Sequence, residues 1–382
     1  MSNSMRQDWQ QICFEAMLEY IPEDFTTAEI TERFRSVAEH IDVIGSYLQA
    51  DTTTNDSIAK YYSMAGIGHK EISNYETALD YYFISVSIRK RNNNEEALGL
   101  VYNNIAVIYT IKAMYKSALE YSHKSIEISE KFHVPQVELI ISYNNLTSLY
   151  LQCSSYDKAL EWNAKALKTA EESELADNPI IADVHIMRAA IHYANEQFDE
   201  ALTLDFKALN ILKRHYPEEH TDIGAAYNSI ARENFSLKHY DTALEYYLMA
   251  HKIYKTVYGE DDSDTAEVCG SIAKTYMALE NYNCALEWCL KALKTQRKVL
   301  GNENPETILR HSFLSEIYER LELYDDAIDH LLIILDYYAK VEEVKIIQII
   351  SERIADDYEL LNNPSEADKY RKMALEAGER NE

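Results

Sequence analysis

Paired asparagines occur twice in this sequence, and their side chains could bind a peptide backbone. Tyr102-Asn103-Asn104 and Tyr143-Asn144-Asn145 share one order, and Tyr227-Asn228-Ser229 is a partial third copy. An asparagine amide offers both a donor and an acceptor, so it can pair with the N–H and C=O groups of an extended peptide of any sequence. Asparagine is slightly unfavourable inside a helix, which argues against a role in helix stability. The pairs indicate either peptide contact or hydrogen bonds to a neighbouring repeat.

Further candidate residues continue the same helical face. Val107 and Ser148 lie three residues after Asn104 and Asn145, and equivalent positions recur later in the chain. The predicted peptide-binding residues are Asn103, Asn104, Val107, Asn144, Asn145, Ser148, Met187, Tyr193, Asn228, Arg232 and Lys274. This surface is largely neutral and partly apolar. Arg232 and Lys274 are isolated cations that could hold an acidic side chain or a peptide C-terminus, or could simply be solvated.

The elements that position these residues follow from an internal repeat. The pattern aromatic-x-x-Ala falls at Tyr75/Ala78, Tyr115/Ala118, Tyr156/Ala159, Phe198/Ala201, Tyr240/Ala243, Tyr282/Ala285 and Tyr324/Ala327, with a degenerate copy at Pro364/Ala367. Successive alanines are 40 to 42 residues apart. A period in this range predicts a solenoid of stacked helical hairpins rather than a globular enzyme domain.

Small residues at fixed positions predict how each hairpin packs. The residues twelve positions before each alanine are Gly66, Ala106, Thr147, Ala189, Ala231, Ala273, Ser315 and Ala355, and further small residues mostly stand seven positions after it. Small side chains let two helices approach closely, while aromatic side chains fill the space beside them. The first helix of each hairpin, helix A, is expected to line the concave surface. The candidate residues lie on helix A, three and two positions before the small residue and one and four after it.

This pattern resembles the tetratricopeptide repeat (TPR) family over residues 58–378, and the period near 42 resembles its kinesin-light-chain-like subclass. The resemblance implies an all-α, right-handed superhelical solenoid of about eight helix-turn-helix repeats. They are expected near residues 58–93, 98–133, 139–174, 181–215, 223–258, 265–300, 307–341 and 345–378. The usual ligand of such a fold is a protein or peptide segment that lies extended in the concave groove.

The first 57 residues do not fit the repeat. Helices are expected near residues 5–19 and 27–49, and Ile21-Pro22 separates them. Thr26-Thr27-Ala28-Glu29-Ile30 faintly resembles the start of a DNA-binding helix-turn-helix, but the surrounding charge is acidic. We expect residues 1–57 to form a helical cap over the open end of the solenoid.

Composition narrows the possible partners and compartment. The net charge of −27 disfavours nucleic acid and anionic membranes, and fits a basic partner or simply an acid-faced helical array. No apolar run is long enough to span a bilayer, and no secretory signal is evident. The five cysteines show no disulfide framework or zinc-ligand spacing, so they are expected to be reduced, which favours the cytoplasm. No metal or cofactor is expected.

The sequence predicts a non-enzymatic scaffold or adaptor that binds a peptide in the TPR groove. It has no phosphate-binding glycine loop, no His-Glu-x-x-His and no nucleophile elbow, and His69, His192 and His311 fall at packing positions. The alternative is a Rap-like receptor for a signalling peptide, which would regulate a response regulator through conformational change. The segment before the repeats looks short for the three-helix output bundle of that class. The oligomeric state stays open.

Overall fold

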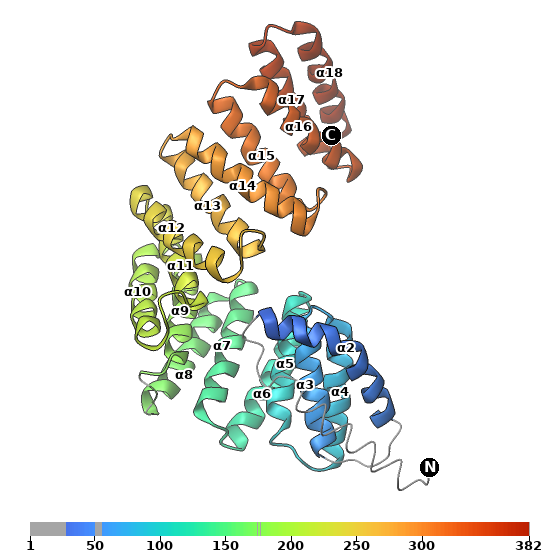
Figure 1. The fold of residues 1–382 in the computed structure, drawn as a ribbon, viewed down its shortest axis with the longest axis vertical. Coiled ribbons are helices and arrows are strands. Elements are labelled where there is room, and N and C mark those ends of the chain that lie inside the picture. The colour runs from blue at the N-terminus through green and yellow to red at the C-terminus, as the bar shows by residue number, and fades with distance from the viewer. Residues whose placement is uncertain (1–27, 50–55, 174, 176, 382) are drawn as a thin grey trace. The chain divides into compact units, whose positions relative to one another are not determined.

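The computed structural model describes residues 28–49, 56–173, 175 and 177–381, and their regular structure consists of 17 helices without a strand (Figure 1). The prediction of an all-α helical repeat array is confirmed. The chain divides into two compact units, Met1–Asn195 and Glu196–Glu382, and each is described by itself.

The first unit contains eight described helices. They are α2 (Ala28–Gln49), α3 (Asp56–Glu71), α4 (Tyr75–Arg91), α5 (Leu98–Ile111), α6 (Tyr115–Lys131), α7 (Gln136–Gln152), α8 (Tyr156–Glu172) and α9 (Ile180–Ala194). Helices α3/α4, α5/α6 and α7/α8 form hairpins. The helix expected over 27–49 is α2, whereas the one expected near 5–19 lies outside the described residues.

The second unit begins with α10 (Phe198–His215) and continues through three hairpins and a terminal pair. These are α11 (Thr221–Ser236) with α12 (Tyr240–Val257), α13 (Ser263–Ala278) with α14 (Tyr282–Leu300), α15 (Pro305–Arg320) with α16 (Tyr324–Lys340), and α17 (Val344–Leu360) with α18 (Pro364–Asn381). Each A helix thus carries one of the predicted small residues.

The repeated alanines mark the closest packing within the hairpins. All eight, from Ala78 to Ala367, are at most 1% exposed. The small residue on the facing A helix can also have no room for a larger side chain. A Cβ added to Gly66 would lie 2.6 Å from the Tyr82 ring, which is closer than a side chain can approach. Aromatic rings therefore fill the space that small residues leave on the facing helix.

The turn that follows each A helix has one residue in the left-handed region. These residues precede the repeated aromatic position by two and have φ between 53° and 63°; they are Ser73, Ala113, Ser154, Glu196, Lys238, Glu280, Glu322 and Asn362. In seven of the turns the following N–H donates to the carbonyl five residues earlier, as Met114 N–H does to Tyr109 O over 2.8 Å. This is the hydrogen-bond pattern of a Schellman motif, which ends helix A cleanly.

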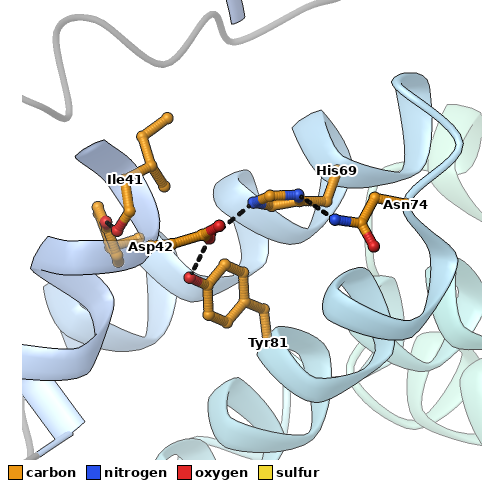
Figure 2. A network of polar contacts seen from close by, with 6 residues as sticks. Ile41, Asp42, His69, Asn74 and Tyr81 are labelled. Atoms are coloured by element: carbon orange, nitrogen blue, oxygen red, sulfur yellow. Dashed lines mark hydrogen bonds and ion pairs between the residues drawn. The ribbon is translucent and has the colours of Figure 1, made fainter. Parts of the chain in front are cut away.

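Helix α2 packs on the first hairpin through an apolar and a polar contact. Phe34 and Ile41 are fully buried, and a Cβ added to Gly68 of α3 would lie 2.1 Å from the Phe34 ring. Beside them, the Asp42 carboxylate accepts hydrogen bonds from Tyr81 Oη at 2.5 Å and His69 Nε2 at 2.9 Å (Figure 2). This packing covers apolar surface of α3 and α4 that would otherwise face water. The cap formed by residues 1–57 stays a prediction.

Candidate peptide-binding surface

The first unit has a cavity that is lined by the A helices α3 and α5, by the B helices α4 and α6, and by the connectors before α5 and α7. Its volume is about 720 Å³, and its lining includes Ser63, Met64 and Ile67 of α3 and Asn104 of α5. These four occupy the helix-A positions that the repeat register assigns to the groove, counted from Gly66 and Ala106. Lys60, Arg89 and Leu100 also line it, together with the start of α7. The cavity thus combines apolar contact area with amide and cationic groups.

The second unit has a smaller cavity of about 380 Å³ between α13 and α15. Gly270, Ser271 and Lys274 line it from α13, and Ser312, Phe313 and Glu316 line it from α15. All six are groove positions of the register, counted from Ala273 and Ser315. Both cavities lie within the range of about 300–1,000 Å³ that is typical of ligand sites.

The asparagines divide between two environments. Asn145 Nδ2 donates to Asn103 Oδ1 over 3.0 Å, which joins α7 to α5, and Asn103 is buried. Asn144 is also buried, and its Oδ1 accepts no hydrogen bond within the described part of the chain. Asn104 is half-buried and faces the first cavity. The neighbouring-repeat contact is therefore present for one pair, while Asn104 remains available to a ligand.

The other predicted residues lie on A helices but line neither cavity, except Lys274. Val107, Ser148, Met187, Tyr193, Asn228 and Arg232 are half-buried. Lys274 is exposed, and its ammonium lies 4.9 Å from the centre of the Phe235 ring. Of the predicted residues, Asn104 thus lines the cavity of the first unit and Lys274 lines the cavity of the second.

Arg310 and Phe313 are lining residues that the sequence reasoning missed. The repeat register could have predicted Phe313, because Phe313 and Glu316 occupy in α15 the positions that Ser271 and Lys274 occupy in α13. Arg310 lies outside the register, so its place at the cavity depends on side-chain packing that periodicity does not describe.

A buried acid pair is a second feature that the sequence reasoning missed. Glu233 of α11 and Asp205 of α10 are 0% and 1% exposed. Burial, and then the charge of the nearby Asp205, raises the pKa of Glu233, and burial also raises the pKa of Asp205. Glu233 stands two positions after Ala231. Four other repeats have Ile108, Leu149, Ile191 and Ile317 at this register position, whereas Gly68, Thr275 and Asp357 occupy it in the remaining three. Periodicity alone therefore did not single out Glu233.

The polar network of α2 has the composition of a catalytic dyad but the geometry of a structural contact. His69 is 1% exposed, and its two ring nitrogens contact Asp42 and Asn74 (Figure 2). Burial lowers the pKa of His69 despite the adjacent carboxylate. His69 is therefore a core histidine, in keeping with the packing role expected from its position.

Residues 28–49, 56–173, 175 and 177–381 hold no group of three or more His, Cys, Asp or Glu placed to bind a metal ion. Cys153, Cys269, Cys284 and Cys289 are free thiols. Across these same ranges, each helix is too short or too polar to cross a bilayer.

Comparison with known protein families identifies the repeat. The tetratricopeptide repeat model matches residues 97–172, 180–256 and 262–339, which is more than half of the chain. The chain belongs to the tetratricopeptide repeat family, and the predicted resemblance is confirmed. No curated protein matches the sequence.

Two of the similar solved structures share the fold over most of this chain at low sequence identity. A Rap protein complexed with competence and sporulation factor has a TM-score of 0.56 at 13% identity, over 99% of this chain and 98% of that one. A signal transduction ATPase with a TPR sensor, from Pyrococcus horikoshii, has a TM-score of 0.63 at 14% identity, over 88% and 52%. A putative kinesin light chain from Podosopora anserina is similar at 17% identity over 54% and 98%, with a TM-score of 0.48.

Proposed function

We propose that this protein is a non-enzymatic scaffold that binds an extended peptide segment of a protein partner along its A helices. One observation carries the proposal: groove positions of the repeat register line a cavity in each unit. Ten residues at these positions, on four A helices, take part. A surface that repeats along the chain suits a ligand that also repeats, and the peptide backbone is such a ligand.

The chemistry of the first cavity supports this assignment. Asn104 can donate to and accept from one peptide unit. Met64, Ile67 and Leu100 offer apolar contact, and Leu100 is 55% exposed, so a bound side chain would remove apolar surface from water. The free thiols among the described cysteines favour a reducing compartment such as the cytoplasm.

A Rap-like receptor for a signalling peptide is the second candidate. The fold match to the Rap complex over 99% of this chain favours it. In this candidate, peptide binding would alter the packing of α2 on α3 and α4, and a protein partner would read that change. The scaffold candidate needs no such change.

To test the proposal, the full chain is first used to capture partners from the native host's lysate. The affinity of each purified partner for the wild type and for the variants is then measured. Asn104→Ala and Leu100→Asp alter the first cavity at partly or fully exposed positions, so the fold should survive. Met114→Asp is the matched control, because Met114 is 45% exposed and lines neither cavity. We expect affinity to fall about tenfold or more for the two cavity variants, and to be unchanged for the control.

Equal binding by all variants would place the partner elsewhere and overturn the proposal. Hydrogen exchange of α2 with and without the partner separates the two candidates. Faster exchange in the complex supports the receptor, whereas unchanged exchange supports the scaffold.

A further inference from the structure

The guanidinium of Arg310 lies directly on the backbone of α13. A Cβ added to Gly270 would stand 2.2 Å from Nη1 and 2.3 Å from Nη2 of Arg310. A methyl group at position 270 would therefore displace the guanidinium from this place. Arg310 Nε also donates to Gln296 Oε1 over 3.2 Å. The side chain is thus half-buried and held in place at the wall of the second cavity.

Neither cation of this cavity has an acidic partner. Among the described residues, no carboxylate lies within 4.0 Å of the charged nitrogens of Arg310 or Lys274. In the next A helix, by contrast, Arg353 pairs with Glu319 at 2.7 Å. The chain has 64 acidic and 37 basic residues, so acids were available for pairing. A partly desolvated guanidinium gains most from a carboxylate, to which it can make two parallel hydrogen bonds.

The acids at the cavity limit what kind of anion fits. Glu267 and Glu316 also line it, and both are exposed. Together with Lys274 and Arg310 they make the lining formally neutral. The chain itself carries a net charge of −27, which repels polyanions at long range. A single carboxylate on an otherwise neutral or basic peptide satisfies both conditions.

We propose that this cavity binds one Asp or Glu side chain of the peptide partner, between Lys274 and Arg310, and that the flanking peptide residues are neutral or basic. The inference rests on the proposed function and specifies the partner's chemistry. Phe313 and the 70%-exposed Leu309 line the same cavity and supply apolar surface for the aliphatic stem of that side chain.

A random peptide library displayed on phage, selected on the immobilised full chain, provides the probes. We expect selected peptides to share one acidic position. Replacing that residue by its amide should weaken binding to the wild type by about tenfold to a hundredfold, the range for a hydrogen-bonded charged group. In the Arg310→Gln variant, replacing the acidic peptide residue by its amide should change the affinity by less than about threefold, because the interaction between that acid and Arg310 is already absent.

Three further variants sharpen the test. Lys274→Gln removes the second cation. Gly270→Ala keeps the charge of Arg310 but displaces its guanidinium, and should also reduce the preference for the acid. Lys294→Gln is the matched control, since Lys294 is exposed on α14 and does not line the cavity. Circular dichroism checks that each variant is folded.

The outcomes separate the two proposals. Selected peptides without a shared acid, which still depend on Asn104, overturn this inference and leave the proposed function standing. A preference that survives in Arg310→Gln, or that depends on the free C-terminus instead of a side chain, also overturns it. If the library yields no binders at all, both proposals fail.

Discussion

Asn145 Nδ2 donates a 3.0 Å hydrogen bond to Asn103 Oδ1, so two amides in successive repeats pair across the A helices α5 and α7. Asn103 is 6% exposed, whereas Asn145 is half-buried. The pair therefore fixes the spacing of the two helices beside Asn104, which lines the first cavity. Two repeats that share one sequence motif are joined by that motif.

The first prediction concerns this pair. Asn103→Ala and Asn145→Ala should each lower the free energy of unfolding, and the double variant should lose about 1 kcal/mol less than the sum of the two, because both single changes break the same bond. Urea unfolding of the four proteins measures this coupling. Strictly additive losses would show that the bond contributes nothing to stability.

The second prediction concerns the buried carboxyl of Glu233. Because the pKa of Glu233 is raised in the folded state, this carboxyl keeps its proton in the folded protein at pH values where it loses the proton in the unfolded chain. The free energy of unfolding should therefore decrease as the pH rises above about 4.5. Glu233→Gln removes that proton uptake and should raise the free energy of unfolding by about 2 kcal/mol at pH 7. The gain should shrink near pH 5. A variant that is less stable than wild type at pH 7 would contradict this reading.

The third prediction concerns the pair His311 and His330, whose effect on the pH dependence of stability is opposite to that of Glu233. The Nδ1 atoms of His311 and His330 are 2.6 Å apart, and burial, then His330, then Arg297 lower the pKa of His311 to about 4. The unfolded state therefore binds more protons below pH 6.5, and stability should fall as pH drops from 6.5 towards 4. Relative to His311→Gln, the wild type should lose about 2 kcal/mol between pH 7 and pH 5. Parallel stability curves for the two proteins would rule out this contribution.

The fourth prediction concerns the hairpin turns. Ala113 has φ of 55°, a conformation that a Cβ disfavours and glycine adopts freely. Ala113→Gly should therefore stabilise the chain by about 0.5–1 kcal/mol, after the larger entropy of the unfolded glycine chain is taken into account. Asn362→Gly, at the same turn position, should gain less because asparagine tolerates this region. Thermal unfolding of the two variants compares them directly.

The repeat predicted much of the fold because its spacing records which residues meet inside each hairpin. Ala78 and its equivalents are buried as the pattern implies, and groove positions of the register line the cavities in α3 and α15 as well as in α5 and α13. The ligand-binding role of the predicted residues remains a prediction.

For the asparagine pairs, the sequence predicted side-chain pairing between repeats as one of two alternatives but could not choose between them. The Asn103–Asn145 bond depends on the rotamers of two residues on different hairpins, and periodicity carries no information about rotamers. The contact of Arg310 with Gly270 depends on a long side chain crossing from one A helix to the next. The sequence alone did not distinguish an unpaired cation at a cavity from a solvated one.

The division of the chain at Asn195 has a consequence for experiments on fragments. The predicted repeat at residues 181–215 ends with α10, whereas the first compact unit ends after α9. Helix α9 packs on α7 and α8, and α10 packs on α11. The boundary of the sequence repeat and the boundary of the compact units therefore differ. A fragment cut at 195/196 keeps each helix with those packing partners, whereas one cut after residue 215 would remove α10 from α11 and expose apolar side chains such as Leu209 and Leu212, which the whole protein keeps from water.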